Sequence, residues 1–190
     1  KEVIENRKIA SASAKSPGDL LLLVGADTGR DGIHGASGLA SRTFEQQTEM
    51  RSAVQVGNPF LEKVLIEACL ESLDIPGVVG LQDCGAAGIT SAAIEMAERS
   101  GMGLKLIIEN VPRREKGMTP YEVMLSESQE RMLAIVEPES LDRVLEISTR
   151  WEIAASVIGR VTGDGQLRIL DGFDGNVLAE LPASTLHDDA

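Results

Sequence analysis

Residues 59–81 read PFLEKVLIEACLESLDIPGVVGL and place a helical pattern directly before a short apolar strand. Pro59 suits the first turn of a helix, and apolar side chains recur at helical spacing through residues 59–72. The β-branched run at residues 77–81 then predicts a strand. A helix followed closely by a strand indicates a sheet with helices packed against it.

The same alternation of strands and helices continues on both sides of this stretch. Strands are expected at residues 20–25, 104–108, 131–136 and 154–161, and helices at residues 120–125 and 141–151. Thr90 is the expected cap of a further helix that runs to about Ser100. Asp164-Gly165 fits a hairpin turn into a strand at residues 167–170. We therefore predict an α/β (α+β) fold, a mixed β-sheet with flanking helices.

Composition favours one soluble domain with an aliphatic core. The chain has 190 residues, of which 43% are hydrophobic but only 3% aromatic. That balance favours an α/β architecture over a β-sandwich. The net charge of −12 argues against nucleic acid or an anionic membrane as a partner, although it does not exclude a phosphorylated small molecule.

Cysteine usage and hydropathy bear on location. The two cysteines, Cys69 and Cys84, form neither a disulfide framework nor a zinc spacing, so we expect a reducing cytoplasm. The longest apolar stretch, residues 20–24, is far too short to span a bilayer.

A glycine-punctuated loop follows the first expected strand. Residues 25–35 contain Thr28, Arg30, Asp31 and His34 among four glycines, and such loops often present backbone N–H groups to a phosphate. The loop matches neither a P-loop nor the dinucleotide fingerprint. A tight connection whose polar side chains satisfy the turn is the alternative interpretation.

Three further positions could carry chemistry. Asp83 stands before the small residues 85–88, where a carboxylate could bind Mg²⁺, or could cap the next turn. The run of residues 126–129 offers hydrogen-bonding side chains, or is a solvated loop with Glu130 and Arg131 as surface charges. Gln55 lies between two valines, a pattern that also fits the solvated face of a strand.

These segments together resemble one family. Residues 28–36, 54–60, 82–88 and 117–132 occur in the order, and with the residues, of the synthetase subunit of phosphoribosylformylglycinamidine synthase. The similar region covers roughly residues 20–136 and points to the first AIR-synthase-type C-terminal domain of that subunit. Cys84 departs from the pattern, which often has Met there, and we interpret the change as one of packing.

The resemblance implies a ligase of purine biosynthesis. It would use ATP and Mg²⁺ to convert formylglycinamide ribonucleotide, with ammonia from a glutaminase subunit, into the amidine, assisted by a small accessory subunit. Carried onto this chain, Gln55, Glu127, Ser128 and Gln129 would contact substrate and Asp83 would bind Mg²⁺.

The resemblance also limits what this chain does alone. The family's catalytic histidine and main ATP-binding residues belong to a preceding domain, so no catalytic residue is assigned here, His34 included, and the fragment is expected to be inactive. Residues 1–170 would form the domain, and residues 171–190 its end and a linker toward a following domain. The alternatives are a non-catalytic scaffold and a related superfamily enzyme with another phosphorylated substrate.

Overall fold

The computed structural model of the protein describes residues 11–33, 55–172 and 175–186. Within these ranges seven strands form one mixed sheet in the order β2-β4-β1-β5-β3-β6-β7. Strands β3 and β6 are parallel, and the other neighbours are antiparallel. The strands are β1 Leu20–Gly25, β2 Val78–Asp83, β3 Gly103–Ile107, β4 Arg131–Val136, β5 Ala155–Thr162, β6 Gln166–Leu170 and β7 Val177–Pro182.

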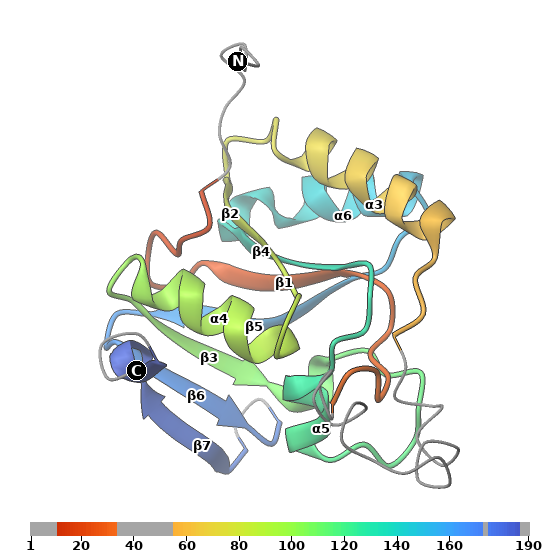
Figure 1. The fold of residues 1–190 in the computed structure, drawn as a ribbon. Coiled ribbons are helices and arrows are strands. Elements are labelled where there is room, and N and C mark those ends of the chain that lie inside the picture. Colours follow the sequence, from red (N-terminus) through yellow and green to blue (C-terminus); the bar gives the residue numbers. More distant parts are fainter. Residues whose placement is uncertain (1–10, 34–54, 173–174, 187–190) are drawn as a thin grey trace, which may run out of the picture.

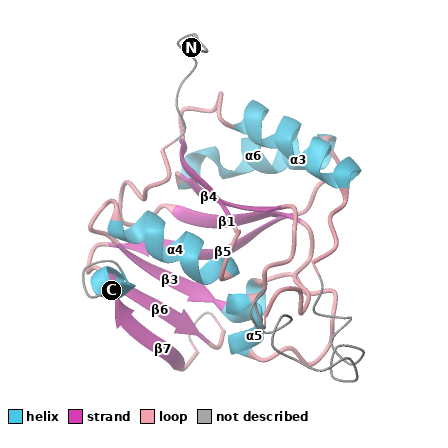
Figure 2. Ribbon diagram, in the orientation of Figure 1, coloured by secondary structure: helices cyan, strands magenta, loops and turns pink. Residues whose placement is uncertain are grey.

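Helices lie on both faces of this sheet (Figures 1 and 2). Helices α3 and α6 cover one face, and α4 and α5 lie on the other. The α-helices are α3 Pro59–Ser72, α4 Gly88–Glu98, α5 Pro120–Leu125 and α6 Leu141–Arg150, with short 3₁₀ turns at Ile108–Asn110, Pro138–Ser140 and Ala183–Leu186. The predicted mixed sheet with flanking helices is confirmed, and α3 and α5 have the predicted bounds.

The alternation of side chains along β1 explains the two layers. Leu21 and Leu23 join the core beneath α4, whereas Leu22 and Val24 join the core beneath α3 and α6. Successive side chains of a strand point to opposite faces, so an uninterrupted apolar run fits a strand that is covered on both sides. β1 therefore lies in the interior of the sheet, between β4 and β5.

The predicted hairpin at Asp164-Gly165 is wrong, because β5 and β6 do not pair. Strand β3 lies between them, antiparallel to β5 and parallel to β6. The chain does turn at Gly165, where φ is +68°, but the turn passes over the start of β3. A Cβ added to Gly103 would lie 2.4 Å from the side-chain oxygens of Thr162 and Asp164. A turn signal thus specifies local backbone geometry, not the neighbouring strand.

The predicted cap of α4 is also wrong. The helix begins at Gly88, after Ala87 with φ of +58° and without a side-chain cap. Thr90 already lies in the first turn, and its Oγ1 donates a hydrogen bond of 2.9 Å to the carbonyl of Met124 in α5. The threonine therefore joins two helices instead of starting one.

The last described strand, β7, completes the sheet. β7 pairs antiparallel with β6, so the chain beyond Leu170 returns to the sheet. The predicted boundary between a domain and a linker at residue 171 stays a prediction. Among the residues that the structure describes, no helix is long and apolar enough to cross a membrane.

Candidate functional site

Four segments far apart in the sequence meet at the side chain and backbone of Glu127. Its Oε2 accepts a hydrogen bond of 2.7 Å from Nε2 of Gln55, and its Oε1 accepts one of 3.1 Å from the backbone N–H of Ala87. Its own N–H donates to the carbonyl of Asp31 at 2.8 Å. The glycine loop, the segment before α3, the loop after β2 and the polar run before β4 therefore form one site.

Gly32 shows why the first of these segments needs glycine. Its φ is +69°, and a Cβ added there would lie 2.3 Å from Oε2 of Glu127. The backbone conformation disfavours a larger residue, and the close approach of the carboxylate leaves no room for its Cβ. The glycine loop is thus shaped to fit against Glu127.

Two buried serines join the glycine loop to the polar run. Ser128 is 1% exposed, and its Oγ accepts a hydrogen bond of 2.9 Å from the N–H of Gly29 and donates to the carboxylate of Asp31. Ser126 donates to the carbonyl of Gly29 at 2.6 Å. Both hydroxyls are therefore used inside the protein, beneath the exposed part of the site.

Arg131 is buried under the same loops, and the interpretation of this residue as a surface charge is wrong. It is 3% exposed, and Nε donates to the carbonyl of Ser128 at 3.0 Å. Nη1 donates to Oγ1 of Thr28 at 2.9 Å, and Nη2 donates to the carbonyl of Ser126. Burial lowers the pKa of the guanidinium from its usual value. Arg131 thus holds the polar run in its bent path by binding two of its carbonyls.

A second set of charged contacts holds the glycine loop from its other side. Arg30 forms ion pairs of 2.9 Å with Glu115 and 2.7 Å with Glu122, and Arg114 pairs with Asp31. Hydrogen bonds from Arg30 and then from the N–H of Thr119 lower the pKa of Glu122 to about 2. These ion pairs therefore hold the glycine loop against α5 and the segment that leads into it.

Glu130 also accepts a hydrogen bond from the segment before α3, in this case from the backbone of Asn58. Its Oε1 accepts a hydrogen bond of 2.8 Å from the N–H of Asn58, and its own φ is +55°. Oδ1 of Asn58 in turn accepts from the N–H of Leu61 at 3.2 Å and so caps α3. Two carboxylates three residues apart therefore place the start of α3 beside the polar run.

Asp83 lies at the exposed end of β2, on the rim of a cleft of about 420 Å³. The cleft separates α3 from the loops of the site, and Gly85 and Gln129 also line it. The Asp83 carboxylate accepts a hydrogen bond of 3.3 Å from the side-chain amide of its neighbour Gln82. No group of three or more His, Cys, Asp or Glu side chains that could hold a metal occurs among the described residues. A single open carboxylate fits Mg²⁺, which takes one or two protein carboxylates and otherwise binds phosphate and water.

Two thiols line the same cleft. Burial raises the pKa of both Cys69 and Cys84 to about 11, so both are neutral near pH 7. Neither thiol is suited to act as a nucleophile, in agreement with a packing role for Cys84.

Of the candidate site residues named from the sequence, four have side chains that reach the surface and one, Ser128, is buried. Gln55 and Glu127 bind each other, and Gln129 and Asp83 are exposed at the cleft. Ser128 lies below them with its hydroxyl already bonded. His34 lies outside the described residues. Sequence reasoning missed the roles of Asp31, Glu130 and Arg131; the charged residue at the head of the apolar run 132–136 was the available signal for Arg131.

Comparisons with known proteins identify the family and the relatives that this chain resembles. The family described as "AIR synthase related protein, C-terminal domain" matches residues 16–172. The phosphoribosylformylglycinamidine synthase subunit PurL of Thermomicrobium roseum is 59% identical over 98% of this chain and 25% of its own length. The chain therefore spans about a quarter of that curated relative.

Solved structures of PurL from Thermotoga maritima have the same fold. The complex with FGAR aligns with a TM-score of 0.81 and 35% identity, over 94% of this chain and 29% of that chain. The complex with ATP gives a TM-score of 0.78, and the PurLQS structure from the same organism gives 0.79. Both are 33% identical over 93% of this chain and 27% of the other.

Proposed function

The chain belongs to the family of the C-terminal domain of AIR synthase related proteins, and we propose that it is the substrate-holding part of a carbon–nitrogen ligase of purine biosynthesis. The reaction would convert formylglycinamide ribonucleotide, ATP and glutamine-derived ammonia into formylglycinamidine ribonucleotide. A PurL complexed with FGAR and a PurL complexed with ATP are the relatives that support this assignment.

The meeting of four segments at Glu127 is the observation that carries the proposal. The fourth segment carries Glu127, and each of the other three contributes a contact to its carboxylate or its backbone, through Asp31, Gln55 and Ala87. A purely structural role would not require all four segments to meet at one residue. Their convergence at an open surface beside Asp83 is what a small polar substrate requires.

The proposed roles follow from exposure. Gln55, Glu127 and Gln129 would offer hydrogen bonds to the sugar, amide and phosphate groups of the substrate, because their side chains reach the surface. Ser128 is buried, with its hydroxyl bonded to Gly29 and Asp31 and its carbonyl bonded to Arg131, so it would act on the substrate by holding the loop in place beneath these side chains. These contacts would orient the formyl amide and exclude part of the surrounding water.

Asp83 is the proposed Mg²⁺ ligand. When bound, the ion would neutralise phosphate charge during phosphoryl transfer. The carboxylate at the rim of the cleft would hold that charge next to Gln129. Most contacts to ATP, and those to a glutaminase subunit and a small accessory subunit, would come from parts of the full-length protein outside this chain.

Amidine formation by the full-length parent tests the proposal. With ATP, Mg²⁺ and ammonia as co-substrates, Asp83→Ala and Gln55→Ala should each lower turnover at least about tenfold. Excess Mg²⁺ should partly restore the Asp83 variant. Asp142→Ala, which removes an exposed carboxylate on α6, is the matched control and should leave turnover unchanged.

A non-catalytic scaffold is the second candidate, and the bond between Gln55 and Glu127 favours it, because each side chain satisfies the other. It predicts that both substitutions leave activity nearly intact. A third candidate, a related enzyme with another phosphorylated substrate, predicts that the parent forms no amidine from formylglycinamide ribonucleotide at all.

A further inference from the structure

Asp31 is a buried carboxylate beneath a site whose other acidic side chains reach the surface. Asp31 is 4% exposed, whereas Asp83 is exposed and Glu127 is partly exposed. Burying a carboxylate costs folding free energy unless a charge partner and hydrogen-bond donors replace the lost water. Because so little of Asp31 is exposed, it is not placed to bind a ligand at the open surface, and its presence in the site calls for another explanation.

The carboxylate of Asp31 is bound from two segments. Arg114 forms an ion pair with Oδ2, and the hydroxyl of Ser128 donates to the same oxygen. Ser128 is itself held by the N–H of Gly29, which donates to its Oγ at 2.9 Å. The backbone N–H of Arg114 donates to the carbonyl of Thr28 at 3.0 Å. The Asp31 carboxylate is therefore fixed between the segment that leads into α5 and the polar run before β4.

The backbone of Asp31 holds the residue next to Ser128. The N–H of Glu127 donates to the carbonyl of Asp31 at 2.8 Å, so one residue of the glycine loop binds two consecutive residues of the polar run. The two oxygens of the Glu127 carboxylate accept from Ala87 and Gln55. Asp31 thus determines where the main chain of Glu127 lies, and from that point its side chain reaches the other two segments.

We propose that Asp31 is a positioning residue that acts on the substrate through Glu127. The proposal rests on the function proposed above, in which Glu127 contacts formylglycinamide ribonucleotide. Without the charge of Asp31, Ser128 would be held less tightly, and the polar run would shift relative to Ala87 and Gln55. A displacement of about 1 Å in a group that orients a substrate can lower a reaction rate by about a hundredfold.

Steady-state kinetics of the full-length parent test the proposal. Asp31→Asn keeps the size of the side chain, but the amide has one acceptor oxygen and no charge for Arg114 and Ser128 to share. The KM for formylglycinamide ribonucleotide should rise at least about tenfold, and the KM for ATP should change less than about twofold. A role confined to folding would lower the amount of active enzyme, and so the apparent kcat, without raising either KM.

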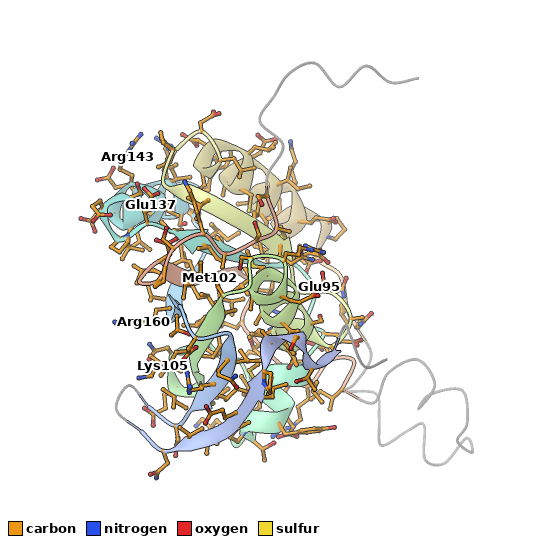
Figure 3. The ribbon with its side chains drawn as sticks, turned by 90° about the vertical axis from the view of Figure 1, so that its left-hand side faces the viewer. Glu95, Met102, Lys105, Glu137, Arg143 and Arg160 are labelled. Atoms are coloured by element: carbon orange, nitrogen blue, oxygen red, sulfur yellow. The ribbon has the colours of Figure 1, made fainter. Side chains whose placement is uncertain are left out.

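A double-mutant cycle tests whether Asp31 acts through Glu127. Glu127→Ala should itself raise the KM for formylglycinamide ribonucleotide, and adding Asp31→Asn to that variant should change this KM by less than about twofold. Glu137→Gln is the matched control. Its carboxylate also pairs with a cation, Lys15, but lies beyond the opposite end of β4 (Figure 3), so both KM values should stay unchanged.

Ser128→Ala provides a second route if Asp31→Asn does not fold. It keeps the ion pair between Asp31 and Arg114 and removes the hydroxyl that ties the polar run to Asp31. The KM for formylglycinamide ribonucleotide should rise at least about threefold, as expected for one lost hydrogen bond, and this rise should also disappear in combination with Glu127→Ala.

Three results would overturn the proposal. If folded Asp31→Asn and Ser128→Ala variants keep the parent's KM while Glu127→Ala raises it, the positioning role fails and the proposed function stands. Effects of Asp31→Asn and Glu127→Ala that multiply independently would mean that Asp31 does not act through Glu127. If Glu127→Ala itself leaves the KM unchanged, Glu127 does not bind the substrate, and the proposed function fails together with this inference.

Discussion

The two loops that carry the candidate site are held in opposite ways. The loop of residues 126–131 rests on buried polar groups: Arg131 binds two of its carbonyls, and Ser128 is tied to Asp31. The loop of residues 83–88 is held mainly by backbone contacts, and Asp83 at its head is exposed. One loop is fixed by its own side chains, whereas the other leaves its charged side chain available.

This difference suggests a division of work between the loops. Groups that must recognise a substrate benefit from being held in place before binding, because less entropy is lost on association. A carboxylate that must receive a hydrated cation needs an open coordination sphere instead. Substitutions in the first loop should therefore affect stability strongly, and substitutions at the exposed end of the second should affect it little.

Arg131→Met should have the largest effect. It would leave the carbonyls of Ser126 and Ser128 and the hydroxyl of Thr28 without a donor in a buried place, at a cost of about 3 kcal/mol in the free energy of unfolding. Urea unfolding of the 190-residue chain measures it, with the exposed Arg143→Met as control. A loss below about 0.5 kcal/mol would contradict the buried role.

Gly88→Ala should come next, and it probes a place where the second loop lies directly against the first. Gly88 has φ of +57°, and an added Cβ would lie 1.9 Å from the carbonyl of Ser126. Gly101→Ala is the matched control, because Gly101 has φ of +64° and no atom within 4 Å of the added Cβ. We expect about 1 kcal/mol for the control, from conformation alone, and about 1 kcal/mol more for Gly88. Equal losses would mean that the loops adjust independently.

Glu122→Gln should have a smaller effect that depends on pH. The pKa of Glu122 in the folded protein is about 2, below its ordinary value of 4.5, because Arg30 and Thr119 donate to the carboxylate. Its stabilising contribution is therefore fully present above pH 4.5 and is lost as pH falls toward 2. Unfolding free energies of wild type and variant should differ by a constant amount above pH 4.5 and converge below it. A difference that persists at pH 2 would indicate a packing effect.

Asp83→Asn should have the smallest effect on stability. Because the carboxylate is exposed and makes no ion pair among those found in the described residues, the free energy of unfolding should change by less than about 0.5 kcal/mol. The same substitution should strongly lower turnover in the parent if the proposed Mg²⁺ role is right. A destabilised Asp83 variant would remove the contrast between the two loops.

Local patterns predicted many elements to the residue. Strands Leu20–Gly25 and Arg131–Val136 and helices Pro59–Ser72 and Pro120–Leu125 have the predicted bounds, because glycine, proline or a charge marks where each apolar pattern begins or ends. The hairpin after β5 could not be predicted correctly, since the turn at Gly165 contains no information about β3. Pairing between strands distant in sequence depends on the packing of the whole sheet.

The sequence marked the segments that meet in the candidate site but not how they meet. Asp83 was singled out beside the small residues 85–88, Glu127 in the polar run 126–129, and Gln55 between two valines. The burial of Arg131 depends on Thr28, which lies in a different segment, so a charge at the head of the apolar run 132–136 does not by itself identify that partner. Contacts of this kind require the folded chain.

The turn that passes over β3 has a consequence for how quickly the protein reaches its fold. Of the strand pairs that the structure describes, β6 with β7 is the one that joins consecutive strands. Every other pair waits for distant parts of the chain to meet, so loop-closure entropy opposes the early steps of folding. Refolding should therefore be slow for a chain of this size, with the β6–β7 hairpin able to form first and the central strands β1 and β3 assembled together with their distant partners.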